Sequence, residues 1–459
     1  MDRICEDLLK LIGEKERVVP GDRIEEKYLS DTLGRLKGKA QALVFAESAE
    51  EVSRVMKYAY ENGIAVTPRG AGTNLVGSTV PQKGGVILDV SRMNRILEID
   101  EETFTATGEP GIVLQDFQQY VESIGLFYPP DPGEKTATIG GNIATNAGGM
   151  RAVKYGVTRD YVRGLEVVLP DGEITWVGSK NVKDASGLQL KQLFIGSEGT
   201  LCMITKCILR LIPKPDASLS VLVPYEDLNS AIRGVHAIIK ANANPTAIEF
   251  VERSVVELGE KYTGLSFPCP EAKAYILLTF DGLQQQVEQN AGRVQKVAQT
   301  TGALAFIPLT DPAAAADVWK VRGCLVKAVE AVSEQEPVDL VVPISKSAEF
   351  VAFVHQVEAE TGMQMVAFGH AGDGNVHLCI VRGDRDDETW NRELACVMRT
   401  VYGKAYELGG LTSGEHGIGI AKRPYFLENT PAVNLALMRA VKDAIDPKHI
   451  LNDHISYLK

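Results

Sequence analysis

Two glycine-rich segments in the first half of the chain limit what it can fold into more than any other feature. The first, PRGAGTNLVG, spans residues 68–77, and the second, TATIGGNIATNAGG, spans residues 136–149 after the rigid YPPDPG of 128–133. Glycine has no Cβ, so such residues adopt positive φ and can turn successive backbone N–H groups towards one point. That arrangement is a concave anion site suited to a pyrophosphate. The sequence therefore predicts a nucleotide-cofactor site here.

A nicotinamide-binding Rossmann loop is the competing interpretation of the first segment, and the spacing rejects it. That loop needs G-x-G-x-x-G between a strand and a helix. Gly70 and Gly72 are followed by Leu75 where the third glycine belongs. Pro81 and the glycines at 84–85 come next, so no helix is expected to begin there.

The pattern of apolar residues predicts strands and helices throughout the chain. Ser48 and Glu51 form a capping-box pair ahead of a helix to about Asn62, which Gly63 ends. A second helix is expected over residues 112–124, and a hairpin over residues 165–177. Other expected strands are 42–46, 64–67, 86–90, 103–107, 220–223, 247–251 and 274–280, with a helix over 228–241. The prolines at 213 and 215 predict a domain boundary, followed by a second α+β domain.

Charge and composition exclude several classes of protein. The formal net charge of -12 argues against nucleic acid as a partner. The apolar runs are far shorter than the roughly 20 residues of a membrane-spanning helix, so we expect no integral membrane protein. The N-terminus is too charged for a signal peptide and too acidic for a transit peptide, which predicts a cytoplasmic location. Seven scattered cysteines without a CxxC pair predict free thiols and no iron–sulfur cluster in the chain.

Two short histidine motifs in the second half predict a metal site. His370 and His377 lie in HAGDGNVH, and Glu415 and His416 lie in SGEHGIG. Residues 365–368 and 376–381 are expected strands around the turn at 371–375, which brings both imidazoles onto neighbouring strands of a hairpin. Two imidazoles and the Glu415 carboxylate suit one divalent cation, whether Zn²⁺, Fe²⁺ or Mn²⁺, with positions left open for substrate or water.

The glycine-rich motifs, together with IGSEGT at 195–200, resemble the FAD-binding domain of the vanillyl-alcohol-oxidase/p-cresol-methylhydroxylase superfamily. Within it, the chain from about residue 35 is most similar to the family of D-lactate dehydrogenase, the glycolate oxidase flavin subunit and D-2-hydroxyglutarate dehydrogenase. The resemblance implies an α+β fold with a two-subdomain FAD-binding domain and an α+β substrate (cap) domain. The implied organisation is an N-terminal helical segment (1–35), the FAD-binding domain (36–215), the cap domain (216–410) and a C-terminal segment that returns to the flavin (411–459).

The resemblance also implies where FAD binds. The first loop would bind the pyrophosphate, and the flavin ring would lie near the second glycine run and residues 197–204. Some relatives attach FAD through a histidine of the first loop; here that loop has Asn74 and no histidine or cysteine, which predicts non-covalent FAD. The implied FAD-binding residues are Pro68, Arg69, Gly70, Ala71, Gly72, Thr73, Asn74, Leu75, Gly77, Pro132, Gly133, Thr138, Gly140, Gly141, Ala144, Asn146, Gly149, Glu198, Gly199, Ile204 and Asn452.

In the family that these motifs resemble, the equivalents of His370, His377 and Glu415 ligate the metal and the equivalent of His416 is the base. Oxidation of a 2-hydroxy acid needs a group that accepts the hydroxyl proton, and a neutral imidazole suits this at physiological pH. Arg322, in a W-x-x-R segment like that of the family, is the expected partner of the substrate carboxylate. Asn375 is expected to bond to the metal shell or the substrate.

The sequence thus predicts a flavin dehydrogenase for a small D-2-hydroxy acid, D-lactate first and glycolate second. Because the chain has no clustered thiolates, we expect a separate electron acceptor: an electron-transfer flavoprotein, an iron–sulfur subunit or a quinone. One alternative is a flavin-dependent transferase of the alkyl-dihydroxyacetonephosphate synthase type, although Glu415 stands where those enzymes have a histidine-rich run. The other is a non-catalytic flavin subunit, against which the intact histidine motifs argue.

Overall fold

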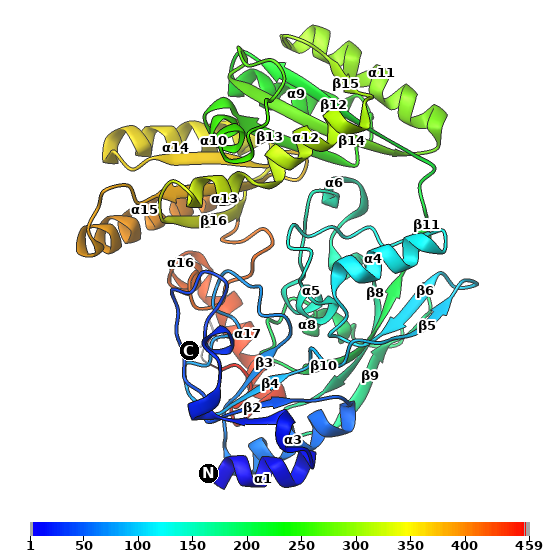
Figure 1. Ribbon diagram of the computed structural model, residues 1–459, viewed down its shortest axis with the longest axis vertical. Coiled ribbons are helices and arrows are strands. Elements are labelled where there is room, and N and C mark those ends of the chain that lie inside the picture. The colour runs from blue at the N-terminus through cyan, green and yellow to red at the C-terminus, as the bar shows by residue number, and fades with distance from the viewer. Residues whose placement is uncertain (1–2, 454, 456–459) are drawn as a thin grey trace. The chain divides into compact units, whose positions relative to one another are not determined.

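The computed structural model describes residues 3–453 and 455, and its chain divides into two compact units (Figure 1). Unit 1 contains the chain up to Ala147, the segment Val157–Lys214 and the chain from His416 onwards. Unit 2 contains Gly148–Gly156 and Pro215–Glu415. The end of the second glycine-rich segment therefore belongs to unit 2, which the sequence did not predict.

The first sheet of unit 1 has four strands in the order β1-β2-β4-β3. Strands β2 (Ala42–Phe45), β4 (Val86–Asp89) and β3 (Val66–Arg69) are parallel, and β1 (Val18–Pro20) is antiparallel to β2. Helices α1 (Arg3–Ile12) and α3 (Ala49–Asn62) bury their apolar faces in one core with this sheet. As predicted, Ser48 caps α3 by accepting a hydrogen bond from the Glu51 N–H, and Gly63 ends it with φ 64°.

The second sheet of unit 1 is antiparallel, with five strands in the order β5-β6-β10-β8-β9. Its strands are β5 (Ile96–Asp100), β6 (Thr105–Gly108), β8 (Val162–Val168), β9 (Ile174–Gly178) and β10 (Met203–Arg210). The hairpin β8–β9 was predicted; the edge strand β5 was not, because its residues are partly exposed and carry charges among the apolar ones. Beside this sheet lie α4 (Leu114–Ser123) and the short pair β7 (Leu126–Phe127) and β11 (Ile212–Pro213).

The C-terminal segment completes unit 1. After α16 (Arg423–Asn429) and α17 (Ala432–Ile445), Leu451 forms a parallel bridge with Val66 of β3. Lys442, fully buried, donates hydrogen bonds to the carbonyl oxygens of Thr200 and Leu451 at 2.7 and 2.8 Å. The remaining short helices of unit 1 are η1 (Lys15–Arg17), η2 (Gly21–Arg23), α2 (Glu26–Leu29), α5 (Ile139–Thr145), α7 (Thr158–Tyr161) and α8 (Lys191–Phe194).

Unit 2 is built on one antiparallel sheet of seven strands in the order β15-β12-β14-β13-β17-β18-β16. The strands are β12 (Ala217–Tyr225), β13 (Ala247–Glu252), β14 (Ala274–Gly282), β15 (Ile307–Leu309), β16 (Gln335–Val341), β17 (Met365–His370) and β18 (Asn375–Val381). The β17–β18 hairpin is the one that the sequence predicted.

Helices α10 (Arg253–Thr263), α12 (Pro312–Gly323) and α13 (Leu325–Glu330) share a hydrophobic core with one face of this sheet. The other helices of unit 2 are α6 (Ala152–Tyr155), α9 (Leu228–Lys240), α11 (Gln284–Thr301), η3 (Ile344–Lys346), α14 (Ser347–Thr361) and α15 (Asp387–Glu407). Within the described part of the chain, no helix combines the length and the apolar composition needed to cross a membrane.

A buried ion pair joins the N-terminal part of unit 1 to the first turn of α3. Arg17 donates from Nη1 and Nη2 to the two oxygens of Glu51 at 2.7 and 2.8 Å. The two side chains are 4% and 12% exposed. Burial raises the pKa of the Glu51 carboxyl, but the Arg17 guanidinium, the Glu47 N–H and the charge of Arg54 together more than offset this, so the pKa lies below its ordinary value of 4.5.

Replacing Glu51 with Gln should lower the free energy of unfolding by about 1.5–3 kcal/mol at pH 7, since it removes a charged hydrogen-bond partner of a buried arginine. A carboxyl group whose folded pKa is lowered stabilises the fold above its unfolded pKa, and the contribution disappears as the pH falls through the folded pKa. The difference between the two proteins should therefore shrink below pH 4.5. Denaturant unfolding at several pH values measures this. Glu50→Gln, an exposed carboxylate of the same turn, is the control; equal effects of the two variants at pH 7 would refute the prediction.

Candidate active site

The strand register of unit 2 brings two histidines and two carboxylates onto one face of the sheet. Glu249 of β13 lies directly opposite His370 of β17, and Asp339 of β16 lies directly opposite His377 of β18. His377 also lies opposite Phe368, two residues before His370. Opposed residues, and residues two apart on one strand, point to the same face of a sheet. Across the neighbouring strands β13, β17, β18 and β16, the side chains on this face are therefore Glu249, His370, His377 and Asp339.

Glu415 completes a triangle of donor atoms with the two histidines. His370 Nε2 lies 3.4 Å from His377 Nε2, and Glu415 Oε1 lies 3.7 and 3.6 Å from these two nitrogens. A triangle of these sides has a central point about 2.1 Å from each corner, which is the Zn–N or Zn–O bond length. The three side chains are 8%, 12% and 15% exposed. The donor set therefore fits one divalent cation.

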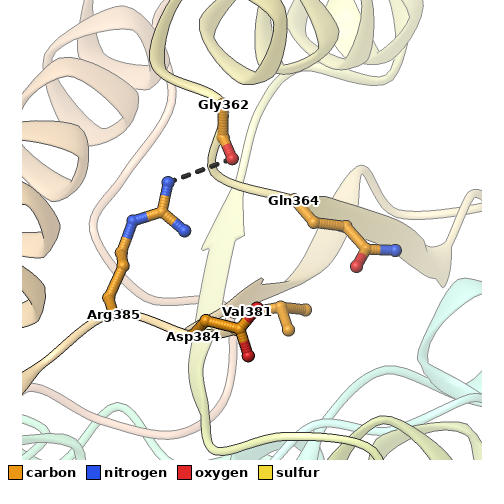
Figure 2. Close-up of a pocket in the computed structure, with 6 residues that line it drawn as sticks. Gly362, Gln364, Val381, Asp384 and Arg385 are labelled. Carbon is orange, nitrogen blue, oxygen red and sulfur yellow. Dashed lines mark hydrogen bonds between the residues drawn. The ribbon is translucent and has the colours of Figure 1, made fainter.

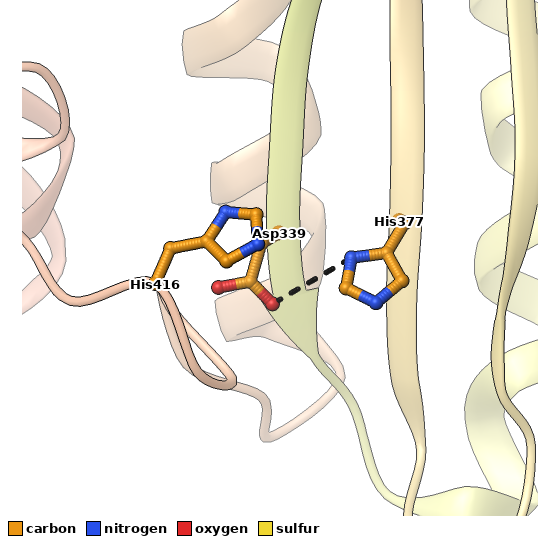
Figure 3. Close-up of side chains that lie close together, drawn as sticks. All are labelled: Asp339, His377 and His416. Atoms are coloured by element: carbon orange, nitrogen blue, oxygen red, sulfur yellow. Dashed lines mark ion pairs between the residues drawn. The ribbon is translucent and has the colours of Figure 1, made fainter. Parts of the chain in front are cut away.

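Each histidine has a fully buried carboxylate behind it, on the side away from this triangle. His370 Nδ1–H donates to Glu249 Oε1 at 2.6 Å. His377 Nδ1 lies 4.0 Å from Asp339 Oδ1, and Figure 3 shows the two groups facing each other. A metal-ligating histidine commonly directs its second ring nitrogen at a carboxylate, which fixes the tautomer and the ring orientation.

Asp339 also holds the segment that carries Glu415. Its Oδ2 accepts hydrogen bonds from Ser413 Oγ at 2.8 Å and from the N–H groups of Gly414 and Glu415 at 3.1 Å each. A Cβ on Gly414 would lie 2.3 Å from Asn375 Nδ2, so a glycine is needed there. The S-G-E part of the motif is thus placed by one carboxylate from β16.

Asn375 supports Asp339. Its Nδ2 donates to Asp339 Oδ1 at 2.7 Å and to the Leu340 carbonyl oxygen at 2.8 Å. Both hydrogens of the amide nitrogen are used in this way. The prediction that Asn375 bonds to the substrate or to the metal shell therefore concerns its oxygen atom, Oδ1.

The charges of these residues also suit a cation. When ionised, Glu249, Asp339 and Glu415 carry three negative charges, and Arg322, hydrogen-bonded to Glu249, carries one positive charge. With neutral imidazoles, two negative charges stay uncompensated within this set, and a divalent cation matches them. Burial lowers the pKa of the His370 imidazole, but the neighbouring Glu249 and Glu415 carboxylates raise it well above 6.5. Burial raises the pKa of Glu415, and His370 and His377 lower it to about 2.

Arg322 of α12 contacts a carboxylate of the protein. It donates from Nε to Glu249 Oε2 at 3.0 Å, and Nη2 donates to the same oxygen. Its guanidinium also lies over the Phe368 ring, 5.1 Å from the centroid. Among the described residues, none accepts a hydrogen bond from Nη1. Nη1 is therefore the nitrogen left for the substrate carboxylate that the sequence predicts as the partner of Arg322.

His416, labelled in Figure 3, follows Glu415 directly in the chain. The peptide bond between the two residues is also the boundary at which the chain passes from unit 2 to unit 1. The predicted base is therefore covalently next to a predicted metal ligand, and the loop that follows it belongs to unit 1.

In unit 1, the buried carboxylate of Glu198 joins the segments that were predicted to bind FAD. It accepts hydrogen bonds from Ser78 Oγ at 2.7 Å and from the N–H groups of Ile418 and Gly419 at 2.9 Å each. The Glu198 N–H donates to the Ala144 carbonyl oxygen at 2.7 Å. Glu198 thus bonds to Ser78 directly after the first glycine-rich segment, to Ala144 of the second segment and to the loop after His416.

The first glycine-rich segment follows β3, and no helix begins in it, in agreement with the rejection of a Rossmann loop. Arg69 is the second residue of the segment, and its Nη2 donates to the Lys27 carbonyl oxygen at 2.6 Å. A Cβ on Gly72 would lie 2.1 Å from this Nη2. Asn74 bonds to the residues that directly follow the segment, donating to the Thr79 hydroxyl at 2.7 Å and accepting from the Ser78 N–H at 2.9 Å. Both side chains shape the segment from within.

The second glycine-rich segment contains α5, a short helix that the sequence did not predict. Thr138 caps its start, and Asn146, with φ 51°, ends it. A Cβ on Gly140 would lie 2.5 Å from the Pro110 side chain, so the helix packs closely on that residue. The predicted FAD-binding residues that lie in unit 1 are Pro68, Arg69, Gly70, Ala71, Gly72, Thr73, Asn74, Leu75, Gly77, Pro132, Gly133, Thr138, Gly140, Gly141, Ala144, Asn146, Glu198, Gly199, Ile204 and Asn452, whereas Gly149 lies in unit 2.

Asn452 gives a direct sign that unit 1 can hold a polar ligand. It is 1% exposed, and its Nδ2 donates to the carbonyl oxygens of Ser78 and Glu198 at 3.0 and 2.8 Å. Its Oδ1 is buried, and no described residue donates a hydrogen bond to it. A buried acceptor of this kind costs free energy until a donor reaches it, and the uracil-like edge of a flavin carries such an N–H. The residues therefore fit FAD.

Comparisons with known proteins decide the family. Residues 40–178 match the family model described as "FAD binding domain", and residues 214–454 match "FAD linked oxidases, C-terminal domain". A D-lactate dehydrogenase of Anaerostipes hadrus is 44% identical, over 95% of this chain and 94% of its own. The glycolate oxidase subunit GlcD of Bacillus subtilis is 38% identical, over 93% and 90%. The chain belongs to the FAD-linked D-2-hydroxyacid dehydrogenase family.

A solved structure supports the fold of this FAD-linked dehydrogenase. p-Cresol methylhydroxylase with substrate bound superposes with a TM-score of 0.81 and 20% identity, over 100% of this chain and 97% of that chain. At this identity the likeness concerns the fold alone. It confirms the predicted α+β fold with a two-subdomain FAD-binding domain of the p-cresol-methylhydroxylase type.

A cavity in unit 2 lies away from the histidines. It has a volume of about 470 Å³ and is lined by Gly362, Gln364, Val381, Gly383, Asp384 and Arg385 (Figure 2). Val381 ends β18, so the cavity is at the opposite end of the hairpin from the turn at His370. Arg385 donates to the Gly362 carbonyl oxygen at 3.0 Å and to Glu393 at 2.9 Å. Its guanidinium is thus bonded within the fold of unit 2.

The sequence interpretation missed Glu249 and Asp339. Each is an acidic residue with apolar neighbours on both sides in the middle of a strand, in AIEFVE and in QEPVDLV. A charge in such a position is rarely buried without a partner. That signal alone marks both residues, although it does not say which partner they have.

Gly148 lies against the candidate metal ligand within unit 2, and Gly148→Ala tests this contact. An added Cβ would lie 2.9 Å from Glu415 Oε2 and 3.2 Å from Glu415 Cβ, so the carboxylate has to shift. We expect Zn²⁺ affinity to fall by about tenfold or more, measured by competition with a chelating dye. Gly292→Ala in α11, where a Cβ meets nothing within 4 Å, is the matched control. Unchanged Zn²⁺ binding in Gly148→Ala would contradict the assigned ligand.

Proposed function

We propose that this protein oxidises a small D-2-hydroxy acid to the 2-oxo acid, with D-lactate as the first candidate and glycolate as the second. The observation that carries the proposal is the triangle of His370 Nε2, His377 Nε2 and Glu415 Oε1, immediately followed in the chain by His416. The relatives named D-lactate dehydrogenase and glycolate oxidase subunit support the choice of substrates.

The two bound groups supply distinct chemistry in this proposal. Bound FAD would supply the acceptor for the hydride of the substrate Cα. A divalent cation held by His370, His377 and Glu415 would supply a Lewis acid that orients the substrate and makes its hydroxyl more acidic. Zn²⁺, Fe²⁺ and Mn²⁺ all suit two imidazoles and one carboxylate.

The residues of the chain handle the proton and the carboxylate. His416, as a neutral imidazole, accepts the proton of the substrate hydroxyl while the Cα hydride leaves. His370, His377 and Glu415 hold the cation. Arg322 is the proposed partner of the substrate carboxylate through Nη1, because Nε and Nη2 are bonded to Glu249. One free nitrogen orients a carboxylate less firmly than a bidentate pair, which gives the cation a larger share of the orientation.

The electrons have to leave the flavin for another molecule. The seven cysteines are free and scattered, so they do not form a cluster that stores electrons. We propose a protein acceptor, either an electron-transfer flavoprotein or an iron–sulfur subunit, and a cytoplasmic location.

Anaerobic addition of D-lactate should bleach the flavin absorbance, and L-lactate should leave it unchanged. Replacing His416 with Asn should slow the reduction by about 10²–10⁴-fold, because the general base is lost. Stopped-flow absorbance with a panel of D- and L-2-hydroxy acids measures both effects. His236→Asn, an exposed histidine of α9, is the control. A flavin that no 2-hydroxy acid reduces would favour the transferase or the non-catalytic subunit instead.

Acid precipitation should release the flavin into the supernatant, since the first glycine-rich segment has Asn74 and no histidine or cysteine. Absorbance of the supernatant and of the redissolved pellet measures the two fractions. A yellow pellet would show covalent attachment and refute this prediction.

A further inference from the structure

The Glu249 carboxylate is a fully buried acidic group beside the donor triangle. It is 0% exposed, and both oxygens are occupied: Oε1 by His370 Nδ1–H at 2.6 Å, and Oε2 by Arg322 Nε at 3.0 Å. Neither bond reaches the triangle itself. Glu249 therefore acts on any ligand of the triangle through His370.

We propose that Glu249, held by Arg322, is a positioning residue that fixes the tautomer and the ring plane of His370 so that its Nε2 lone pair points at the metal position. The inference rests on the proposed function, because it assigns a task to Glu249 in the same site.

Three observations define this task. The register of β13 against β17 places Glu249 directly opposite His370, so the bond follows from the sheet and needs no long, mobile side chain. A proton on Nδ1, donated to Glu249, leaves the lone pair of a neutral imidazole on Nε2. Nε2 is the ring atom that faces His377 and Glu415, at 3.4 and 3.7 Å.

Arg322 makes this arrangement rigid. Two of its nitrogens bond to Oε2 of Glu249, and its guanidinium lies over the Phe368 ring, 5.1 Å from the centroid. The carboxylate is thus fixed on one side by α12 and bonded to His370 on the other. Arg322 also compensates the charge of the Glu249 carboxylate.

The chain offers a matched control on the same strand. Glu252 of β13 bonds to a histidine as well, His355 of α14, at 3.0 Å. His355 is 42% exposed in its side chain, and it is not one of the donors of the triangle. Glu252→Gln therefore removes a carboxylate–histidine pair from β13 without touching the proposed site.

The experiment measures Zn²⁺ affinity of the FAD-loaded protein by competition with a chelating dye, for the wild type, Glu249→Gln, Glu249→Asp and Glu252→Gln. We expect Glu249→Gln to bind Zn²⁺ about 10–100-fold more weakly. Glu249→Asp, which keeps the charge but reaches less far, should show an intermediate loss. Glu252→Gln should match the wild type. The visible absorption of bound Co²⁺ should change in Glu249→Gln and stay unchanged in Glu252→Gln, because only the first alters the orientation of a ligand.

The thermal midpoint of each metal-free variant separates positioning from a general effect on folding. A merely structural role would lower the midpoint of Glu249→Gln without weakening Zn²⁺ binding, and that result overturns the inference. If Glu249→Gln does not fold, Glu249→Asp decides by the same criterion, and Zn²⁺ binding equal to that of the wild type overturns the inference. If the wild type itself binds no Zn²⁺, Fe²⁺ or Mn²⁺, the metal assistance in the proposed function is wrong and the role of Glu249 falls with it.

Discussion

The candidate active site of unit 2 depends on the pairing register of four neighbouring strands, β13, β17, β18 and β16. The register sets Glu249 opposite His370 and Asp339 opposite His377, so a buried carboxylate supports each ring. Asp339 then fixes Glu415 through the backbone N–H groups of 414 and 415. A slip of one residue in either outer pairing would turn a carboxylate to the other face of the sheet. The donor triangle is thus a consequence of sheet geometry.

Local sequence patterns predicted much of the fold and about half of this arrangement. The Ser48 cap, the helix that Gly63 ends and the β17–β18 hairpin depend on neighbouring residues, which single-sequence reasoning can use. Glu249 could not be paired with His370 in this way, because β13 and β17 are separated by more than 100 residues and by three other strands of the chain. The same holds for Arg322, whose partner is set by how α12 packs on the sheet.

Unit 1 also has a buried carboxylate, that of Glu198, to which loop residues bond. Glu198 was predicted as a cofactor residue from its motif, but its carboxylate bonds to Ser78, Ile418 and Gly419. Burial is the main influence on this group and raises its pKa; these hydrogen bonds, which favour the charged form, act in the opposite direction. In both units one buried acidic side chain organises glycine-rich loops that have few side chains of their own to pack. Glycines allow many backbone conformations in these loops, and the hydrogen bonds to the carboxylate stabilise one of them.

The return of the C-terminal segment to unit 1 has a consequence for how the protein is made. Leu451 bridges to Val66 of β3, and the loop after His416 supplies the N–H groups that Glu198 binds. While the ribosome is still adding unit 2, the first sheet lacks this neighbour and Glu198 lacks two of its donors. Contacts between such distant parts of a chain form late. These contacts of unit 1 can therefore form only after the whole of unit 2 has been synthesised.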